Sequence, residues 1–204
     1  MLTLYDYLPS GNGYKVRLLL SQLGKPFKLV ERDIQQGETR TPEFLAMNPN
    51  GRIPVLRLED GRYLSESDAI LFYLAEGTPF LPEDRFERAD VLRWMFFEQY
   101  SHEPYVAVAR AWVHVFGITP ERATRLQEKM DGGYAALGVM ESHLGARAWF
   151  VGERYTIADI ALYAYTHVAH EGNFDLGRFP HVRRWLERVA AQPGHVPITK
   201  RDFA

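Results

Sequence analysis

Two polar residues in the stretch SGNGYK, Ser10 and Asn12, have the types and spacing to act on a sulfur anion. They stand between a strand-like segment and an amphipathic helical one. A hydroxyl and a carboxamide at a helix start can both donate to a thiolate, and the helix dipole favours the same charge, so a bound thiol would have a lowered pKa. The simpler alternative is a helix cap, with the neighbouring glycines permitting the turn.

The thiol would have to come from outside the chain, because the sequence contains no cysteine. This excludes disulfide scaffolds, cysteine-based zinc sites and a Cys-x-x-Cys redox couple. His167 and His170 lie three residues apart beside Glu171. An isolated pair of this kind usually belongs to a surface or a packed face, and no further ligand cluster accompanies it, so no metal site is expected.

The stretch YLSESDAI combines a helix start with two residues that a helix start does not need. Ser65 and Asp68 have the spacing of an acidic capping box, which would account for both of them. Glu66 and Ser67 are left over in the first turn. Ser67 and the backbone N–H groups there suit a carboxylate, and Glu66 suits an ammonium. Together they match an α-amino acid head group.

Pro54, in the stretch NPNGRIPVL, begins a strand. A trans bond is the usual state, since only about 5–6% of X–Pro bonds are cis in folded proteins. A cis Ile53–Pro54 bond would turn the Ile53 N–H and C=O toward a peptide-like ligand, which would pair with them as another strand would. The sequence is compatible with both isomers.

The elements that must position these residues alternate through residues 1–76. The stretches LTLY, PFKLVERDI, IPVLRLED and RYLSES are typical of strands, the last two joined by the hairpin-forming pair Asp60-Gly61. Helices are predicted where Val16, Leu19, Leu20 and Leu23 recur with helical spacing, and in PEFLAM and SESDAILFYLAEG. The order predicts an α/β domain, a mixed sheet with helices against it.

The rest of the chain shows only helical patterns. A long helix from Arg85 to Phe116 is interrupted by Pro104, another covers Pro120 to Leu144, and two more follow. Thr156 and Asp159 form a second capping box, expected to serve folding. The predicted architecture is therefore an α/β domain of residues 1–76 followed by an all-α domain of residues 84–204.

Composition excludes several classes of protein. The net charge of −2 leaves no electrostatic footprint for nucleic acid. No apolar run approaches the roughly 18 residues of a membrane span. The first residues, MLTLYDY, lack the regions of a signal peptide, so a cytoplasmic protein is predicted.

Four stretches resemble, in order and across essentially the whole chain, the signature stretches of cytosolic glutathione S-transferases of bacterial theta-, nu- and beta-like types: YLPSGNGYKVRLLL, TPEFLAMNPNGRIPVL, LSESDAILFYLAEG and FVGERYTIADI. The resemblance implies a thioredoxin-like N-terminal domain with a cis proline, and an all-helical C-terminal domain. It also implies glutathione as co-substrate with no other cofactor, a small electrophile as second substrate, a role in detoxification, and usually a homodimer.

The resemblance also assigns residues by position. Ser10 matches the serine of the theta-like type or the cysteine of the beta type, and Asn12 resembles the asparagine of the Thr-Pro-Asn-Gly pattern of the nu-like type, so both are predicted to be catalytic. The residues implied to hold glutathione are Arg40, Arg52, Ile53, Pro54, Glu66 and Ser67. The residues implied to line the second-substrate pocket, around the kink at Pro104, are Tyr100, His102, Tyr105, Arg110 and Trp112.

Tyr5 and Tyr7 lie near the catalytic tyrosine of mammalian-type enzymes, but Tyr7 is one residue too close to the following helix. Neither tyrosine is expected to activate the thiol.

The predicted reaction is attack of the bound glutathione thiolate on an electrophilic carbon, with the protein lowering the thiol pKa and orienting the partner. Glutathione-dependent disulfide or peroxide reduction is an alternative, since a second glutathione can replace a protein cysteine. A non-catalytic interaction module on the same fold is a third possibility. Loss of Ser10, Glu66 or Ser67 would favour the module, and all three are present.

Overall fold

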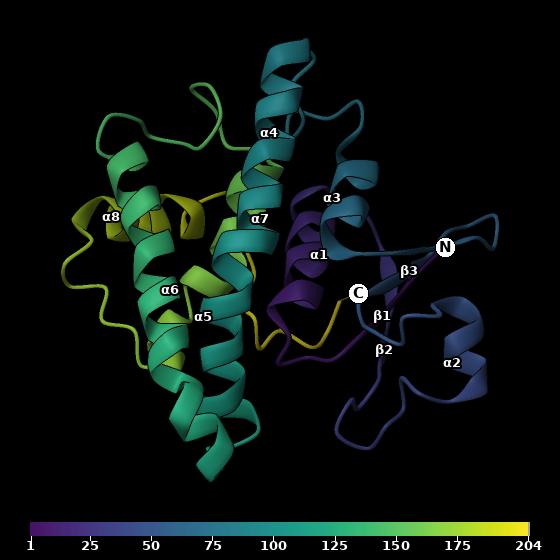
Figure 1. Ribbon diagram of the computed structural model, residues 1–204. Helices are drawn as coiled ribbons and strands as arrows, with labels where there is room; N and C mark the ends of the chain where they lie inside the picture. Colours follow the sequence, from purple (N-terminus) through teal and green to yellow (C-terminus); the bar gives the residue numbers. More distant parts are fainter. Residues whose placement is uncertain (204) are drawn as a thin grey trace. The chain divides into compact units, whose positions relative to one another are not determined.

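The computed structural model describes residues 1–203 (Figure 1). Contacts divide the chain into two units, one made of residues 1–76 with residues 193–203 and the other of Gly77–Gln192. The sequence places the C-terminal tail in the helical domain, whereas the structure groups it with the N-terminal unit. Apart from the tail, the division into an α/β part followed by a helical part follows the predicted order of elements.

The N-terminal unit contains one mixed sheet, with strands in the order β2–β1–β3–β4. Its strands are β1 (Leu2–Asp6), β2 (Phe27–Glu31), β3 (Val55–Arg57) and β4 (Tyr63–Ser65). β1 runs parallel to β2 and antiparallel to β3, and β3 is antiparallel to β4. The predicted turn between β3 and β4 is present, since Gly61 has a φ of +89° that a glycine adopts without strain.

The helices of this unit are α1 (Gly11–Gln22), α2 (Pro42–Met47) and α3 (Ser67–Ala75), and candidate residues lie at the starts of α1 and α3. α1 packs against α3, and Figure 1 shows the two side by side, with α2 lying away from them. α1 is buried along most of its length, including the predicted core positions Val16, Leu19 and Leu20. The start of α1 follows directly from the carboxyl end of β1 through a short turn, which places polar side chains at one end of the sheet.

The tail joins the N-terminal unit through side chains on one face of α1. The Tyr14 hydroxyl donates to the Val196 carbonyl at 2.7 Å, Arg17 Nη1 donates to the Ile198 carbonyl at 2.7 Å, and Ser21 Oγ donates to the Gly194 carbonyl at 2.8 Å. Residues 14, 17 and 21 have the spacing of one helix face. The tail therefore lies along this face of α1.

The second unit is built from helices: α4 (Arg85–Phe97), α5 (Glu103–Arg110), α6 (Pro120–Leu144), α7 (Ile157–Thr166) and α8 (Pro180–Ala190). π-helical segments at Glu98–His102 and Ala111–Val115 flank α5, and a 3₁₀ turn covers Ala169–Gly172. Pro104 lies in the first turn of α5, where its missing N–H does least harm. The interruption predicted from Pro104 thus takes the form of a π-helical segment just before it.

The core of this unit surrounds α7, which is buried at every residue. Its predicted capping box is confirmed: the Ala158 N–H donates to Thr156 Oγ1 at 3.3 Å, and the Thr156 N–H donates to Asp159 Oδ2 at 2.9 Å. Burial raises the pKa of Asp159 to about 6, against the lowering effect of its hydrogen bonds. Within residues 1–203, every helix is too short or too polar to cross a bilayer.

Candidate functional site

Ser10 stands at the N-cap of α1, immediately after the turn from β1. Its backbone is extended, with φ −75° and ψ 127°, and its half-buried side chain makes no cap hydrogen bond to the first turn of α1. The simpler interpretation of Ser10 as a side-chain cap is therefore not borne out. Asn12 lies in that first turn and is also half-buried.

A buried ion pair fixes the turn that presents these residues. Arg17 Nε lies 2.9 Å from Asp6 Oδ2, and Arg17 Nη2 donates to the Leu8 carbonyl at 2.8 Å. Burial raises the pKa of Asp6 to about 6, although the charge of Arg17 opposes the shift. A side chain at Gly13 would collide with the Asp6 carboxylate, so this close approach of helix to strand requires glycine. The turn is thus held from the strand end, the helix and the loop at once.

The start of α3 differs from the predicted capping box. Ser65 ends β4, where it pairs with Val55, and the helix begins at Ser67 with Glu66 as its N-cap residue. Asp68, the intended partner of Ser65, pairs instead with Lys15 Nζ at 3.2 Å. The capping-box prediction was therefore wrong, because a buried lysine on α1 attracts the carboxylate more strongly than a hydroxyl in the neighbouring strand.

Glu66 itself has an unusual backbone, with φ +68° and ψ 116°. A residue with a Cβ rarely adopts a positive φ, and such strain concentrates at functional sites. Its exposed side chain makes no cap hydrogen bond to α3, as at Ser10 and α1. The protein therefore keeps this unfavourable φ at Glu66 although the Glu66 side chain caps no N–H group of α3.

The starts of α1 and α3 meet through their side chains. Ser67 is buried, and its Oγ donates to Asn12 Oδ1 at 3.3 Å. The structure thus brings together one residue predicted to contact the thiol and one predicted to contact an α-amino acid head group.

A third segment carries the residues predicted to hold the remaining part of a peptide-like ligand. The Ile53–Pro54 bond is cis, with Ile53 half-buried and Pro54 buried. Asn48 Nδ2 donates to the Arg52 carbonyl at 2.8 Å, and Arg40 Nη1 donates to the Asn50 carbonyl at 3.0 Å. The Arg40 and Arg52 side chains are both exposed, so their guanidinium groups remain accessible to an anion.

The two N-terminal tyrosines make other contacts. The Tyr7 hydroxyl accepts a hydrogen bond from Gln35 Nε2 at 2.7 Å, and the Tyr5 ring packs edge-on against Phe44 with centroids 6.5 Å apart. The Tyr7 hydroxyl is thus bonded to a residue of the loop after β2, and the Tyr5 ring is held by packing.

The residues predicted to line a second-substrate pocket fall into two groups within the helical unit. His102 and Arg110 are buried: His102 Nε2 lies 3.0 Å from Thr166 Oγ1, and Arg110 Nε donates to Glu171 Oε2 at 2.6 Å. The other group is more accessible. Tyr100 is 85% exposed, and Tyr105 and Trp112 are half-buried.

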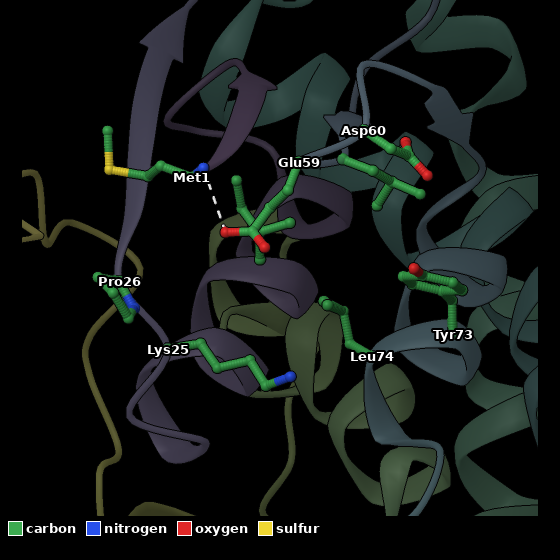
Figure 2. A pocket seen from close by; sticks show the side chains of 9 residues that line it. Met1, Lys25, Pro26, Glu59, Asp60, Tyr73 and Leu74 are labelled. Atoms are coloured by element: carbon green, nitrogen blue, oxygen red, sulfur yellow. Dashed lines mark ion pairs between the residues drawn. The ribbon is translucent and has the colours of Figure 1, made fainter.

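The N-terminal unit has a hollow of about 620 Å³, but none of the candidate residues lines it (Figure 2). It is lined by residues at the amino end of β1, just after the carboxyl end of α1 and near the carboxyl end of α3, including Met1, Lys25 and Leu74. The candidate residues of α1 and α3 lie at the opposite, amino-terminal ends of these two helices. Among residues 1–203, no group of three or more His, Asp or Glu side chains is arranged to hold a metal ion.

Sequence reasoning missed the charged residues that organise the site, namely Asp6, Lys15, Arg17 and Asp68. The signal was present in YKVRLLL: a lysine and an arginine interrupt a segment that otherwise reads as buried helix. Charged residues are almost never fully buried unless they are paired, so each implied a partner. The sequence does not identify which carboxylates those partners are.

An α/β unit with a cis proline and polar helix starts, followed by a helical unit, defines the class of glutathione-dependent transferases with a thioredoxin-like domain. Comparison with family models agrees. Residues 1–76 match the glutathione S-transferase N-terminal domain, and residues 94–193 match the glutathione S-transferase C-terminal domain. The chain therefore belongs to the glutathione S-transferase family and is a glutathione transferase.

Individual relatives support this assignment. A crystal structure of a glutathione S-transferase from Pseudomonas fluorescens is 52% identical, covers 98% of this chain and 99% of its own, and superposes with a TM-score of 0.96. The disulfide-bond oxidoreductase YfcG of Escherichia coli is 33% identical over 95% of this chain and 92% of its own. Ure2p in complex with glutathione is 27% identical, covers 95% of this chain and 90% of its own, and has a TM-score of 0.85.

Proposed function

We propose that this transferase binds glutathione at the starts of α1 and α3. Ser10 and Asn12 stabilise the thiolate, while Glu66 holds the ammonium of the γ-glutamyl head group and the backbone N–H groups at Ser67 hold its carboxylate. The observation that carries the proposal is the 3.3 Å hydrogen bond from Ser67 to Asn12, which joins two helix starts whose N-cap side chains make no cap hydrogen bonds. Helix starts attract anions through their N–H groups and dipole.

Other residues of the N-terminal unit suit the cysteinyl and glycyl parts of glutathione. The Ile53 backbone, next to cis Pro54, pairs with the cysteinyl part of the tripeptide as a strand would. The guanidinium groups of Arg40 and Arg52 are exposed, which supports a role in binding the glycyl carboxylate.

In the reaction, the sulfur electron pair forms a bond to the electrophilic carbon, and the leaving group departs with its bonding electrons. The hydroxyl of Ser10 and the amide of Asn12 contribute by favouring thiolate over thiol before attack. Because the thiolate is the nucleophile, a lower thiol pKa increases the reactive fraction at neutral pH.

The second substrate meets the helical unit at Tyr100, Tyr105 and Trp112, whose rings suit an apolar or aromatic electrophile. His102 and Arg110 lie in the same stretch of helices but do not contact the substrate, since their side chains are buried against Thr166 and Glu171. They maintain the conformation of the π-helical segments that carry Tyr100 and Trp112.

Glutathione-dependent disulfide reduction is a second candidate activity. The 33% identical relative YfcG is a disulfide-bond oxidoreductase, and Asn12 lies in the part of the chain that resembles the nu-like type. The absence of cysteine does not oppose this activity, because a second glutathione can supply the second thiol.

The active form is a homodimer located in the cytoplasm, as the family resemblance suggests. α4 exposes two large aromatic side chains, with Phe86 78% and Phe96 69% accessible. Exposed apolar surface of this kind favours a protein partner. Sedimentation of wild type and of Phe86→Ser/Phe96→Ser tests this part of the proposal, since the double variant is expected to shift toward monomer.

The thiol titration of bound glutathione tests the site. Replacing the residue that stabilises the thiolate by alanine should raise the pKa of the bound thiol by about one to two units, because a charge-assisted hydrogen bond contributes about 1.5–3 kcal/mol, and replacing Ser10 and Asn12 together should raise it further than either change alone. Ultraviolet absorbance of the thiolate against pH measures the shift. Ser10→Ala should show the larger single effect. An unchanged titration in the double variant would contradict the assignment.

A matched control is Thr41→Ala, which removes a real helix cap in the same unit, since Thr41 Oγ1 accepts from the Phe44 N–H at 3.2 Å. It should lower the melting temperature without moving the thiol titration. Turnover with an aryl halide, a disulfide and a hydroperoxide then decides between transfer and reduction.

A further inference from the structure

Lys15 is a fully buried lysine at the centre of the site. It lies on α1 one turn after Asn12, so both side chains project from the same face of the helix. Its exposure is 0%, which is rare for a lysine and requires a compensating partner. No part of the proposed thiol chemistry uses it so far.

The contacts of the Lys15 ammonium run along the starts of α1 and α3. Its Nζ lies 3.2 Å from Asp68 Oδ1 and 3.3 Å from Ser67 Oγ. Ser67 Oγ in turn lies 3.3 Å from Asn12 Oδ1. The carboxylate holds the ammonium in place, and the ammonium then reaches the hydroxyl.

The chemistry of these groups fixes the direction of the chain of hydrogen bonds. An ammonium has donors but no acceptor, so Ser67 Oγ must accept from Lys15. The single hydroxyl proton of Ser67 is then directed to Asn12, which can receive it only on the carbonyl oxygen Oδ1. The amide nitrogen of Asn12 is therefore turned away from Ser67.

We propose that Lys15 is a positioning residue, which acts through Ser67 to orient the Asn12 amide with its N–H groups toward the glutathione sulfur. The inference rests on the proposed function, because it assumes that Asn12 contacts the thiolate. Without the ammonium, the Ser67 hydroxyl is no longer fixed as an acceptor toward Lys15. The Asn12 amide can then rotate and present its oxygen, which repels a sulfur anion.

A purely structural role makes a different prediction. If the Lys15–Asp68 pair only joins α1 to α3, its loss lowers stability but leaves the properties of the bound thiol unchanged. If the ammonium acts on the sulfur only through its charge, its effect is independent of Asn12. Only the relay makes the effect of Lys15 depend on the Asn12 side chain.

The experiment is a double-mutant cycle with Lys15→Met, Asn12→Ala and the double variant, read by the thiolate absorbance of bound glutathione against pH. Lys15→Met should raise the thiol pKa by about half to one unit, and should add little in the Asn12→Ala background. Lys28→Met, which removes an exposed lysine from β2, is the charge-matched control and should leave the titration unchanged.

Two results would overturn the relay: no shift in folded Lys15→Met, or an equal shift in the Asn12→Ala background. Failure of the proposed function looks different, because Asn12→Ala itself would then leave the titration unchanged. If Lys15→Met does not fold, Lys15→Gln replaces it. The carboxamide keeps a polar group in the buried position but ends one bond short of Ser67, so the same non-additivity with Asn12→Ala is expected.

Discussion

The start of α7 and the starts of α1 and α3 carry similar residues but use them in opposite ways. At α7, Thr156 and Asp159 accept hydrogen bonds from the Ala158 and Thr156 N–H groups, so the chain satisfies its own helix start. At α1 and α3, the N-cap side chains of Ser10 and Glu66 make no such bond. Residue type alone does not distinguish a fold-stabilising helix start from a ligand-binding one.

Other helix starts follow the pattern of α7. N-cap side chains accept from the first turn at α2, α4 and α6, through Thr41, Asp84 and Thr119. At α8 a distant carboxylate serves instead, since Glu141 accepts from the His181 and Val182 N–H groups. The N-cap residue of α5, His102, also makes no cap hydrogen bond, but α5 continues directly from a π-helical segment. Since a helix start needs partners for its N–H groups, the starts of α1 and α3 are where an external anion gains most.

The comparison is sharpest at Asp159, where the largest effect is expected. Besides capping α7, its carboxylate accepts from the Trp185 Nε1–H at 2.9 Å and the Phe150 N–H at 3.3 Å. Asp159→Ala leaves these buried donors without their acceptor, so the free energy of unfolding should fall by about 3 kcal/mol or more. Urea unfolding measures the loss. Asp84→Ala, at an exposed cap, should cost about 1 kcal/mol. Equal losses would show that the buried bonds beyond the cap contribute little.

At the start of α3, the proposed role in ligand binding is tested by measuring the affinity for glutathione. Ser67→Ala and Glu66→Ala should each weaken glutathione binding by about tenfold or more. Glu66→Ala removes a charge-assisted contact to the ammonium, and Ser67→Ala removes the hydroxyl that joins this helix start to Asn12 and Lys15. Isothermal titration with glutathione and with cysteinylglycine, which lacks that group, gives the contrast. The dipeptide should bind poorly to wild type and lose little more in either variant. Ser65→Ala, at the end of β4 and two residues before the helix, is the matched control.

Glu66→Gly separates binding from stability at the same position. Glycine adopts a φ of +68° without strain, so this variant should melt at the same temperature as wild type or higher. It should nevertheless bind glutathione weakly, as Glu66→Ala does. A variant that binds normally would place the ammonium contact elsewhere.

The elements of the fold were predictable because local signals specify them. α2 covers the predicted PEFLAM, and the capping box at Thr156 and the Asp60-Gly61 turn form as their residue types imply. These features depend on residues within a few positions of one another. The cis state of Pro54 was left open, because the residues around it allow either isomer.

The features that sequence reasoning missed depend on partners distant in the chain. Asp68 pairs with Lys15, and the tail binds α1 through Tyr14 and Arg17. In each case several partners were chemically possible, and only packing selects one. The Ser65 capping box failed for the same reason, since a local pattern lost to a contact between α1 and α3.

The smallest effect belongs to the hydroxyl cap of α7. Thr156→Ala removes the acceptor for the Ala158 N–H but leaves the Asp159 carboxylate, which still accepts from the Thr156 N–H and from Trp185. The free energy of unfolding should therefore fall by only about 1 kcal/mol, well below the effect at Asp159. Thr156→Ser, which keeps the hydroxyl, should recover most of the loss. Because this helix start serves the fold alone, glutathione affinity of the folded Thr156→Ala protein should equal that of wild type. A normal melt with weakened binding would mean that the start of α7, like those of α1 and α3, takes part in binding the ligand.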